Sequence, residues 1–324
     1  MFLALQLILS LVFFTYVNGN GCAIFDSAGN LFVFGPNGVQ FVGPNPSQWS
    51  SPQPKDPSGS IDFSSSNVVC LSSHYLNAGL FLNANSQDPS TLHKYSFNSR
   101  TWSQISTTGL VPNGNTVRAV IDYDTLVIYA FSDGKLVRLG DANEQNLSKN
   151  PSSLEWVDAN YNVMPFDASA YQPTFAHAFF NLYFFGVPGA GAGQVWGYRI
   201  HYNEWGPGPQ SVGATFPSTH GQTATFSYKD PAENEHDGAP SHVAFIPDDY
   251  SGVWVIDSYT NRTTSVAAAP SAGTTSLTRY SASENLLVQF TPETGRIRYI
   301  DLSDVLVNHM DSSSASWVDV GIVR

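Results

Sequence analysis

The stretches LHKYSFNSRTW (residues 92–102) and VWGYRIHYNEW (residues 195–205) share one layout. In both, a tyrosine lies three positions after an aliphatic residue, and a tryptophan lies seven positions after the tyrosine. An asparagine-containing pair, N-S or N-E, separates the two aromatic residues and is typical of a turn. Self-similarity of this kind indicates a repeat architecture, so the spacing of the motif along the chain decides the fold.

The tryptophans extend the repeat in both directions. Five of the seven tryptophans lie near predicted strand starts, at positions 49, 102, 156, 205 and 317. They are about 53 residues apart except for the last gap, which is about twice as long. Within that gap, VWVIDSYTNRT (253–263) aligns with 195–205 and puts Thr263 at the tryptophan position. The spacing predicts six units, approximately 22–52, 67–107, 116–160, 173–208, 221–267 and 275–324.

Each unit holds several short runs rich in Val, Ile, Tyr, Phe and Thr, bounded by Gly, Pro, Asn and Ser. Such runs predict strands, and no sustained helical period competes with them. The third unit, for example, gives strands at 116–124, 126–132, 135–140 and 154–159. Six four-stranded antiparallel sheets bury their faces best in a closed ring, so we expect an all-β, six-bladed β-propeller. Two separate domains, joined at the Pro-rich segments 50–66 or 206–221, are the alternative.

The layout of these units resembles kelch-type repeats, the blades of galactose-oxidase-like propellers. The two Tyr–Trp motifs carry the resemblance, and the double glycine of kelch blades is here reduced to single residues such as Gly35 and Gly186. The resemblance implies a binding face made of the loops between second and third strands and the loops between units. On that face it suggests the ligand-binding candidates Tyr161, Tyr171, His220, Asp248, Asp249 and Tyr250.

Residues 1–19 have the pattern of a secretory signal peptide. An apolar run from Phe2 to Phe14 is followed by small residues, which suit cleavage after Gly19. A membrane anchor is the alternative, but the run is shorter than the roughly 20 residues that a spanning helix needs. We therefore expect a secreted, extracellular protein whose residues 20–324 form a single domain.

Two cysteines, Cys22 and Cys70, fall in the first strands of units one and two. In an oxidising compartment an even pair predicts one disulfide, with two buried thiols as the alternative. Asn146 and Asn261 begin N-x-S/T sequons, so we expect a glycoprotein.

The net charge of the chain disfavours some classes of binding partner. The chain has 14 basic and 26 acidic residues and a net charge of −12, which disfavours binding to nucleic acid and to anionic membrane surfaces. We expect no membrane association after signal removal, a glycan or an extracellular protein as the partner, and a monomer.

Catalytic signatures are missing: the sequence has no G-x-S-x-G, H-E-x-x-H or G-x-x-x-x-G-K-[ST]. The acidic stretch KDPAENEHDGAPSH (229–242) matches no metal-binding signature, so we predict no metal site and no cofactor. The sequence thus predicts a secreted, non-catalytic binding protein. The alternatives are an extracellular hydrolase, lyase or oxidase that uses an axial funnel, and a structural cell-wall or matrix protein. A copper-radical oxidase would need a Tyr–Cys crosslink, which a Cys22–Cys70 bond precludes.

Overall fold

The computed structural model describes residues 21–51, 54–59, 61–63, 68–83, 88–112, 117–141, 146–159, 163–226, 240–271, 278–308 and 315–322. Over these residues the chain is all-β, as predicted, and its strands pair mainly antiparallel. The predicted signal peptide, residues 1–19, lies outside the described residues. The helices of the described chain are short: η1 (Pro46–Gln48), η2 (Asn146–Lys149), η3 (Ile200–Tyr202) and α1 (Ser303–Asn308).

The strands fall into groups of four in which consecutive strands are antiparallel neighbours. The first three groups are β1 (Cys22–Phe25), β2 (Leu31–Gly35), β3 (Gly38–Gly43) and β4 (Lys55–Asp56); β5 (Val69–Ser73), β6 (Ala78–Leu82), β7 (Thr91–Ser96) and β8 (Thr101–Gly109); and β9 (Arg118–Ile121), β10 (Ile128–Ser132), β11 (Lys135–Leu139) and β12 (Ser153–Asp158).

The last three groups follow the same order. They are β13 (Phe175–Ala178), β14 (Asn181–Phe184), β15 (Gln194–Arg199) and β16 (Glu204–Trp205); β18 (Gly221–Phe226), β19 (His242–Pro247), β20 (Val253–Asp257) and β21 (Arg262–Val266); and β22 (Arg279–Ala282), β23 (Leu286–Thr291), β24 (Arg296–Asp301) and β25 (Val318–Ile322). An additional short strand, β17 (Gln210–Ser211), pairs with β15.

The second and third groups join into one eight-stranded sheet through a parallel β8–β12 pair. β8 is long enough to pair with β7 over residues 101–106 and with β12 over residues 106–109. Gly109 ends this crossing with φ +79°, and a Cβ there would lie 2.3 Å from the carbonyl oxygen of Trp156. Only glycine fits such a conformation and such an approach.

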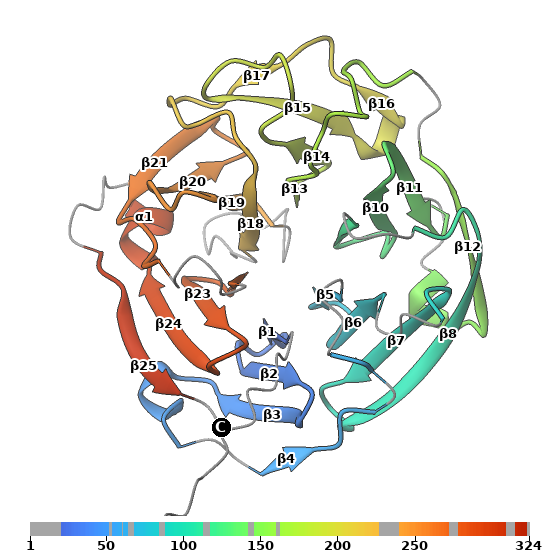
Figure 1. The fold of residues 1–324 in the computed structure, drawn as a ribbon, viewed down its shortest axis with the longest axis vertical. Helices are drawn as coiled ribbons and strands as arrows, with labels where there is room; N and C mark the ends of the chain where they lie inside the picture. The colour runs from blue at the N-terminus through green and yellow to red at the C-terminus, as the bar shows by residue number, and fades with distance from the viewer. Residues whose placement is uncertain are drawn as a thin grey trace, which may run out of the picture.

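The first strands of the six groups, which we call the inner strands, contact one another in a closed series. β1 contacts β5, β5 contacts β9, β9 contacts β13, β13 contacts β18, β18 contacts β22, and β22 contacts β1. Figure 1 shows these strands around a common centre, with the later strands of each group farther out. The hydrophobic core consists of clusters that lie mainly between adjacent groups, such as the one that joins β13–β15 to β9–β11.

The two Tyr–Trp motifs are cross-strand pairs in equivalent hairpins. Tyr95 faces Trp102 across β7 and β8, and Tyr198 faces Trp205 across β15 and β16. Their ring centroids are 5.0 and 5.2 Å apart, which is the range of favourable aromatic contacts. The N-S pair lies in the turn between β7 and β8, as predicted, whereas in the N-E pair only Asn203 lies in the turn and Glu204 already begins β16.

Each of these tyrosines also bonds to the preceding group. The hydroxyl of Tyr95 donates to the carboxylate of Asp56 on β4 at 2.8 Å. The hydroxyl of Tyr198 donates to the carbonyl of Ala159, which follows β12. The motif therefore recurs because it holds neighbouring groups together, since a buried hydroxyl needs a partner.

The alignment of Thr263 with a tryptophan position is also confirmed by its contacts. Thr263 on β21 donates to the carbonyl of Val212, which belongs to the preceding group. Trp317, immediately before β25, donates in the same way to the carbonyl of Ala267, at 3.2 Å. A hydroxyl in unit five thus replaces the indole N–H of unit six.

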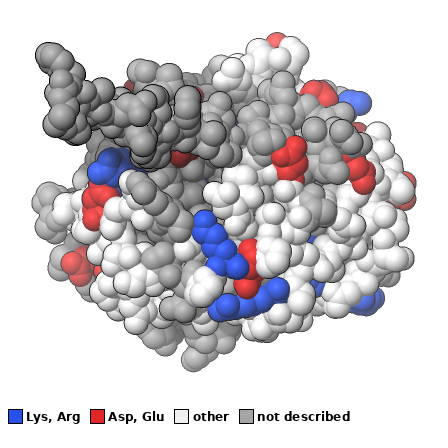
Figure 2. Space-filling model, turned by 60° about the horizontal axis from the view of Figure 1, so that its bottom comes forward, with Lys and Arg blue, Asp and Glu red and all other residues white. Residues whose placement is uncertain are grey.

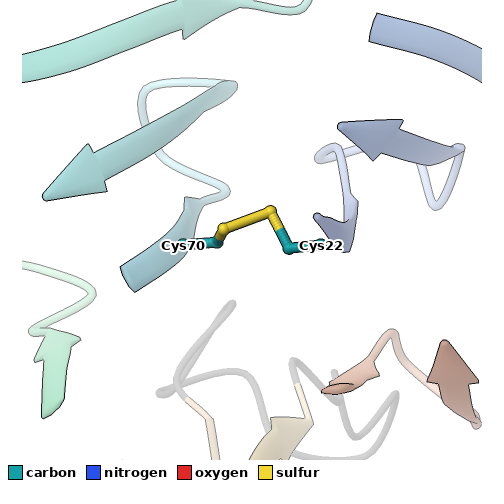
Figure 3. The surroundings of a disulfide bond; sticks show 2 residues. All are labelled: Cys22 and Cys70. Carbon is teal, nitrogen blue, oxygen red and sulfur yellow. A yellow bond between two sulfur atoms is a disulfide. The ribbon is translucent and has the colours of Figure 1, made fainter. Parts of the chain in front are cut away.

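The predicted disulfide is confirmed. Cys22 on β1 and Cys70 on β5 are bonded, with their Cα atoms 6.5 Å apart. Figure 3 shows the bond spanning the space between these two inner strands. It links the first two groups covalently at the centre of the molecule.

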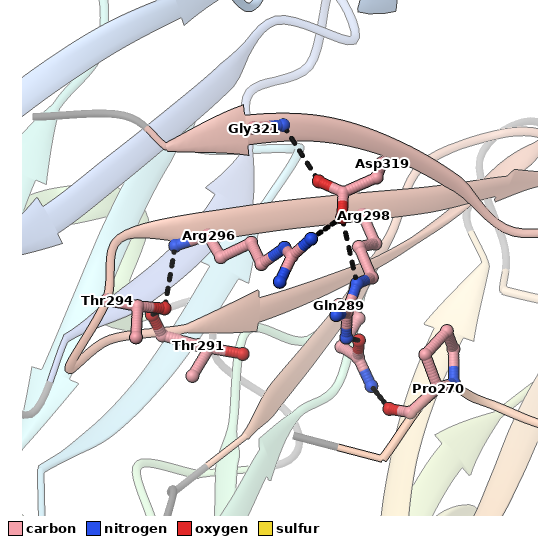
Figure 4. A network of polar contacts seen from close by, with 8 residues as sticks. All are labelled: Pro270, Gln289, Thr291, Thr294, Arg296, Arg298, Asp319 and Gly321. Carbon is pink, nitrogen blue, oxygen red and sulfur yellow. Dashed lines mark hydrogen bonds and ion pairs between the residues drawn. The ribbon is translucent and has the colours of Figure 1, made fainter. Parts of the chain in front are cut away.

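A polar network ties the last strand to its sheet (Figure 4). Asp319 on β25 contacts the guanidinium groups of Arg296 and Arg298 on β24. Arg298 also donates to the side chain of Gln289 at 3.0 Å, and Gln289 donates to the carbonyl of Pro270 at 2.7 Å. The network bridges a register shift in the β24–β25 ladder.

Figure 2 shows basic side chains lying directly beside acidic ones on the face that it draws.

Candidate functional site

A cavity of about 480 Å³ lies among the inner strands, and each of the six contributes residues to its lining. Its volume is within the roughly 300–1,000 Å³ that is usual for small-ligand sites. Neighbouring inner strands run in the same direction: Thr223 and Thr225 of β18 donate to the carbonyls of Phe175 and His177 of β13. The cavity therefore has one end where inner strands begin and another where they finish.

We call the first of these the basic end, because Arg118 begins β9 and Arg279 begins β22, and both side chains line the cavity. Both arginines are half-buried. Burial and the charge of Arg118 lower the pKa of Arg279 to about 10. Burial also lowers the pKa of Arg118, while the nearby carboxylate of Asp248 acts in the opposite direction. The described lining residues include no Asp or Glu, and Arg118 and Arg279 are its two arginines.

Two of the predicted site residues meet at the basic end. Nδ1 of His220, just before β18, lies 2.5 Å from a carboxylate oxygen of Asp248, just after β19. The backbone N–H of Asp248 also donates to the carbonyl of His220. Because the charge of Asp248 reaches Arg118, the pair lies near the rim of the cavity.

Asp249 and Tyr250 extend the same loop. Asp249 is exposed, and its carboxylate accepts from the N–H of Ser251, which stabilises the turn and lowers the pKa of Asp249. Tyr250 has φ +55°, a conformation that is uncommon for a bulky residue. Its half-buried hydroxyl donates weakly to Thr278, at 3.4 Å. Tyr250 therefore lies beside the residue that precedes Arg279.

The two remaining tyrosine candidates lie elsewhere. Tyr171 is buried, and its ring packs against Phe131 and Phe166. Its hydroxyl donates to the carbonyl of Thr174 and accepts from the N–H of Thr174. Because Tyr171 serves the core, we leave it out of the candidate site. Tyr161 lies outside the described residues.

The two sequons begin in a turn and in a short helix. Asn261 is exposed in the turn between β20 and β21, with φ +54°, and stays a predicted glycosylation site. Asn146 begins η2, and its side chain lies outside the described atoms.

The other end of the cavity, which we call the acidic end, contains a buried Asp–His pair. Oδ1 of Asp122, just after β9, lies 3.2 Å from Nε2 of His177 on β13, and both side chains are at most 3% exposed. Tyr123 stacks on the imidazole with ring centroids 6.0 Å apart, and His177 and Tyr123 line the cavity. Burial alone would raise the pKa of Asp122, but the imidazole and the hydroxyl of Thr125 outweigh it, so this pKa lies below its ordinary value.

A second carboxylate lies beside this pair. Burial and the charge of Asp122 raise the pKa of Asp124 above its ordinary value. Asp122 itself has a structural counterpart in Asp26, which follows β1 as Asp122 follows β9. The carboxylate of Asp26 accepts from the N–H groups of Ala28 and Asn30 and so closes its turn. The acidic end is therefore built largely from turn-closing carboxylates.

Sequence reasoning missed the residues that give the cavity its charge. Arg118 in TVRAVID (116–122) and Arg279 in SLTRYSA (276–282) occupy the same position, the first residue of the inner strand, in units three and six. Aligning the six inner strands would have found both arginines. The Asp122–His177 pair depends on which strands are neighbours, and so left no local signal.

Three of the alternatives drawn from the sequence are a copper-radical oxidase, a metal site and a membrane anchor. Both cysteines are in the disulfide, so no thiol is left for the crosslink of a copper-radical oxidase. Within the described ranges no group of three His, Cys, Asp or Glu side chains is arranged to hold a metal ion. Most of the acidic stretch 229–242 lies outside those ranges. The described part of the chain also holds no helix of the length and apolar character that crossing a bilayer requires.

No protein-family model matches the chain, and no curated protein matches its sequence.

Proposed function

We propose that this chain is a secreted, non-catalytic binding protein built as a six-bladed β-propeller, and that its ligand is a glycan held in the central cavity. Support for the propeller comes from the groups of four strands and from the closed series of contacts among the inner strands. The hydrogen bonds by which Tyr95 and Tyr198 hold their groups to the preceding ones add to it.

The cavity is the observation that carries the binding function. It has the volume of a small-ligand site, and its lining combines tyrosine rings, hydroxyl groups and guanidinium groups. Sites that recognise small ligands combine apolar surface with a few polar groups in this way. Tyr75, Tyr123 and Tyr280 supply flat apolar faces, and Arg118 and Arg279 supply donors.

Secretion is supported by the apolar pattern of residues 1–19 and by the disulfide, since disulfides persist mainly in oxidising compartments. An extracellular protein ligand is the variant of this proposal that would use the rim loop at Asp248–Tyr250. A glycan is favoured because the cavity, rather than a flat surface, is the most distinctive feature of the described structure.

A glycan array tests the proposal. Array positions that carry the linker without a glycan control for non-specific binding. Ser281 lies in the middle of β22 and lines the cavity, so Ser281→Tyr should fill part of it. Ser265→Tyr on the exposed surface of β21 is the matched control. We expect glycan binding to be lost in the first variant and kept in the second. Absence of any glycan signal, or signals that Ser281→Tyr leaves unchanged, would contradict the proposal.

A second candidate function, an extracellular hydrolase or lyase, is favoured by one observation. At the acidic end, Asp122, Asp124 and His177 combine shifted carboxyl pKa values with an imidazole that lines the cavity. Such clusters occur at catalytic sites and also in structural networks. Incubating each bound glycan with the protein and analysing it by mass spectrometry separates the two functions: new products that disappear with His177→Gln would establish the enzyme.

A further inference from the structure

We infer that an N-linked glycan on Asn261 folds back onto the molecule, and that its first N-acetylglucosamine occupies a polar groove between the fourth and fifth groups of strands. The attached sugar then acts as an additional contact between these two groups. This inference goes beyond ligand binding in the central cavity. It rests on the secretion proposed above, because N-linked glycans are a modification of secreted chains.

The groove has a volume of about 270 Å³. Residues of β14, β15 and β17 in the fourth group line it, together with the turn between β20 and β21 in the fifth. Its polar side chains are those of Asn181, Tyr183, Arg199, Gln210, Ser258 and Asn261. The volume is slightly below the roughly 300–1,000 Å³ of sites for whole small ligands, so the groove suits a single sugar ring.

The groove is open because Gly197 interrupts a packed interface. Side chains alternate along β15, so Val195, Gly197 and Arg199 belong to one face of the strand. Val195 is buried in the cluster that packs the fourth group against Phe245 and Ile256 of the fifth. At Gly197 no side chain continues this packing, and a Cβ there would meet no described atom within 4 Å apart from its chain neighbours. Gly197 lies inside a regular ladder, so a backbone constraint does not explain the open space.

The side chains around this space can form hydrogen bonds with a sugar. Asn181 on β14 pairs with Arg199 on β15. The amide of Asn181 lies 3.4 Å from the hydroxyl of Tyr183, which pairs with Gly197. Arg199 donates from one terminal nitrogen to Glu204 at 2.9 Å, and a guanidinium has five N–H donors in all. Hydroxyl and acetamido groups both donate and accept hydrogen bonds, so N-acetylglucosamine matches this lining.

The position of the acceptor asparagine identifies the occupant of the groove. Asn261 begins the sequon Asn261-Arg262-Thr263, is exposed in its turn and itself lines the groove. The hydroxyl of Thr263 donates to the carbonyl of Val212, which ties this segment to the fourth group. A sugar attached to Asn261 therefore begins at the edge of the groove. Its effective concentration there is far above that of a free saccharide.

The linkage forms by a displacement that needs no oxidant or reductant. The side-chain nitrogen of Asn261 displaces the diphosphate from the anomeric carbon of an oligosaccharide carried on a polyprenyl diphosphate. A C–O bond breaks and a C–N bond forms, the nitrogen gives up a proton, and the lipid diphosphate leaves.

The test uses the full chain secreted from eukaryotic cells, in which glycopeptide mass spectrometry should find a glycan on Asn261. A peptide N-glycanase, which cleaves between the asparagine and the first sugar, is then applied to the native and to the denatured protein. We expect release from Asn261 to be at least about tenfold slower in the native protein. The reason is that the enzyme reaches the linkage only while the sugar is out of the groove, so the rate follows the population of that open state.

A pair of variants locates the sugar. Gly197→Ile places a side chain in the groove and should speed native release towards the rate of the denatured protein. Gly35→Ile is the matched control, because Gly35 ends β2 in the first group and a Cβ there also meets no described atom within 4 Å beyond its neighbours. Its native release should be as slow as in the wild type.

A measurement on the wild type alone decides the question even if Gly197→Ile folds poorly. An endoglycosidase that leaves only the first N-acetylglucosamine is compared with the N-glycanase, which removes it. Hydrogen–deuterium exchange of the amides in β14 and β15 should be the same in the untreated and the trimmed protein. It should become faster when the first sugar is removed, because the groove then loses its occupant.

The outcomes separate this inference from the proposed function. A secreted protein without a glycan on Asn261 overturns the inference. So does native release that is as fast in the wild type as in Gly197→Ile, or exchange in β14 and β15 that does not respond to removal of the first sugar. None of these results bears on glycan binding in the central cavity, which the array measures. Slow native release together with a blank array supports the inference and overturns the proposed binding function, whereas a chain that cells do not secrete overturns both.

Discussion

The two ends of the central cavity are made from the same six inner strands, but they differ in charge and in construction. At the acidic end, carboxylates follow the inner strands and have partners close by: Asp26 closes its own turn, and Asp122 contacts His177 and Thr125. At the basic end, Arg118 and Arg279 are like charges in one cavity. The contrast is between carboxylates that close turns or contact an imidazole at the acidic end and two arginine side chains that line the cavity at the basic end.

The largest predicted effect concerns the covalent link, which joins the starts of β1 and β5 on the side of the basic end. Replacing both Cys22 and Cys70 by serine should lower the free energy of unfolding by about 4 kcal/mol, because the bond closes a long loop in the unfolded chain. Urea unfolding of the two proteins measures the difference. A loss below about 1 kcal/mol would mean that contacts alone hold the first two groups together.

The next largest loss of stability is expected at the acidic end. Asp122→Asn removes a buried carboxylate that His177 and Thr125 contact, and should cost about 2–4 kcal/mol. Asp133→Asn, in an exposed turn, is the control and should change the free energy of unfolding by less than about 0.5 kcal/mol. Equal effects of the two substitutions would show that the Asp122–His177 contact has no special role.

The pH dependence of unfolding tests the same contribution of Asp122 to stability. The pKa of Asp122 lies below its ordinary value in the folded protein, so its contribution to stability is present above that ordinary value. The contribution is lost as the pH falls through the lowered pKa. Unfolding measured between pH 6 and pH 2 should therefore be less steeply pH-dependent in Asp122→Asn than in the wild type. Parallel pH profiles would contradict this assignment.

At the basic end, removing a charge should not lower the free energy of unfolding. Arg118→Gln relieves repulsion and burial cost, so its free energy of unfolding should be equal to the wild-type value or up to about 1 kcal/mol higher. Arg298→Gln is the comparison, because Arg298 bonds to Gln289 and Asp319 and its loss should destabilise by about 1 kcal/mol. Destabilisation by Arg118→Gln of the same size would make Arg118 a structural residue.

Much of the fold followed from local sequence, and the cavity did not. The strand runs, the Tyr–Trp hairpins and the alignment of Thr263 were predictable because each depends on residues close together in the chain. The parallel β8–β12 pair was not, since it depends on β8 reaching beyond β7 to another group. Of the predicted site residues, His220 and Asp248 do meet, because both lie in loops on one side of the sheets. Tyr171 resembles a loop residue in sequence, but its core position follows from packing against Phe131 and Phe166.

The most direct measurement is a crystal structure of the protein soaked with a glycan that gives a signal on the array. The account predicts electron density for the glycan in the central cavity, in contact with residues of the inner strands. Density confined to the acidic end, to the rim loops or to the outer strands would contradict it.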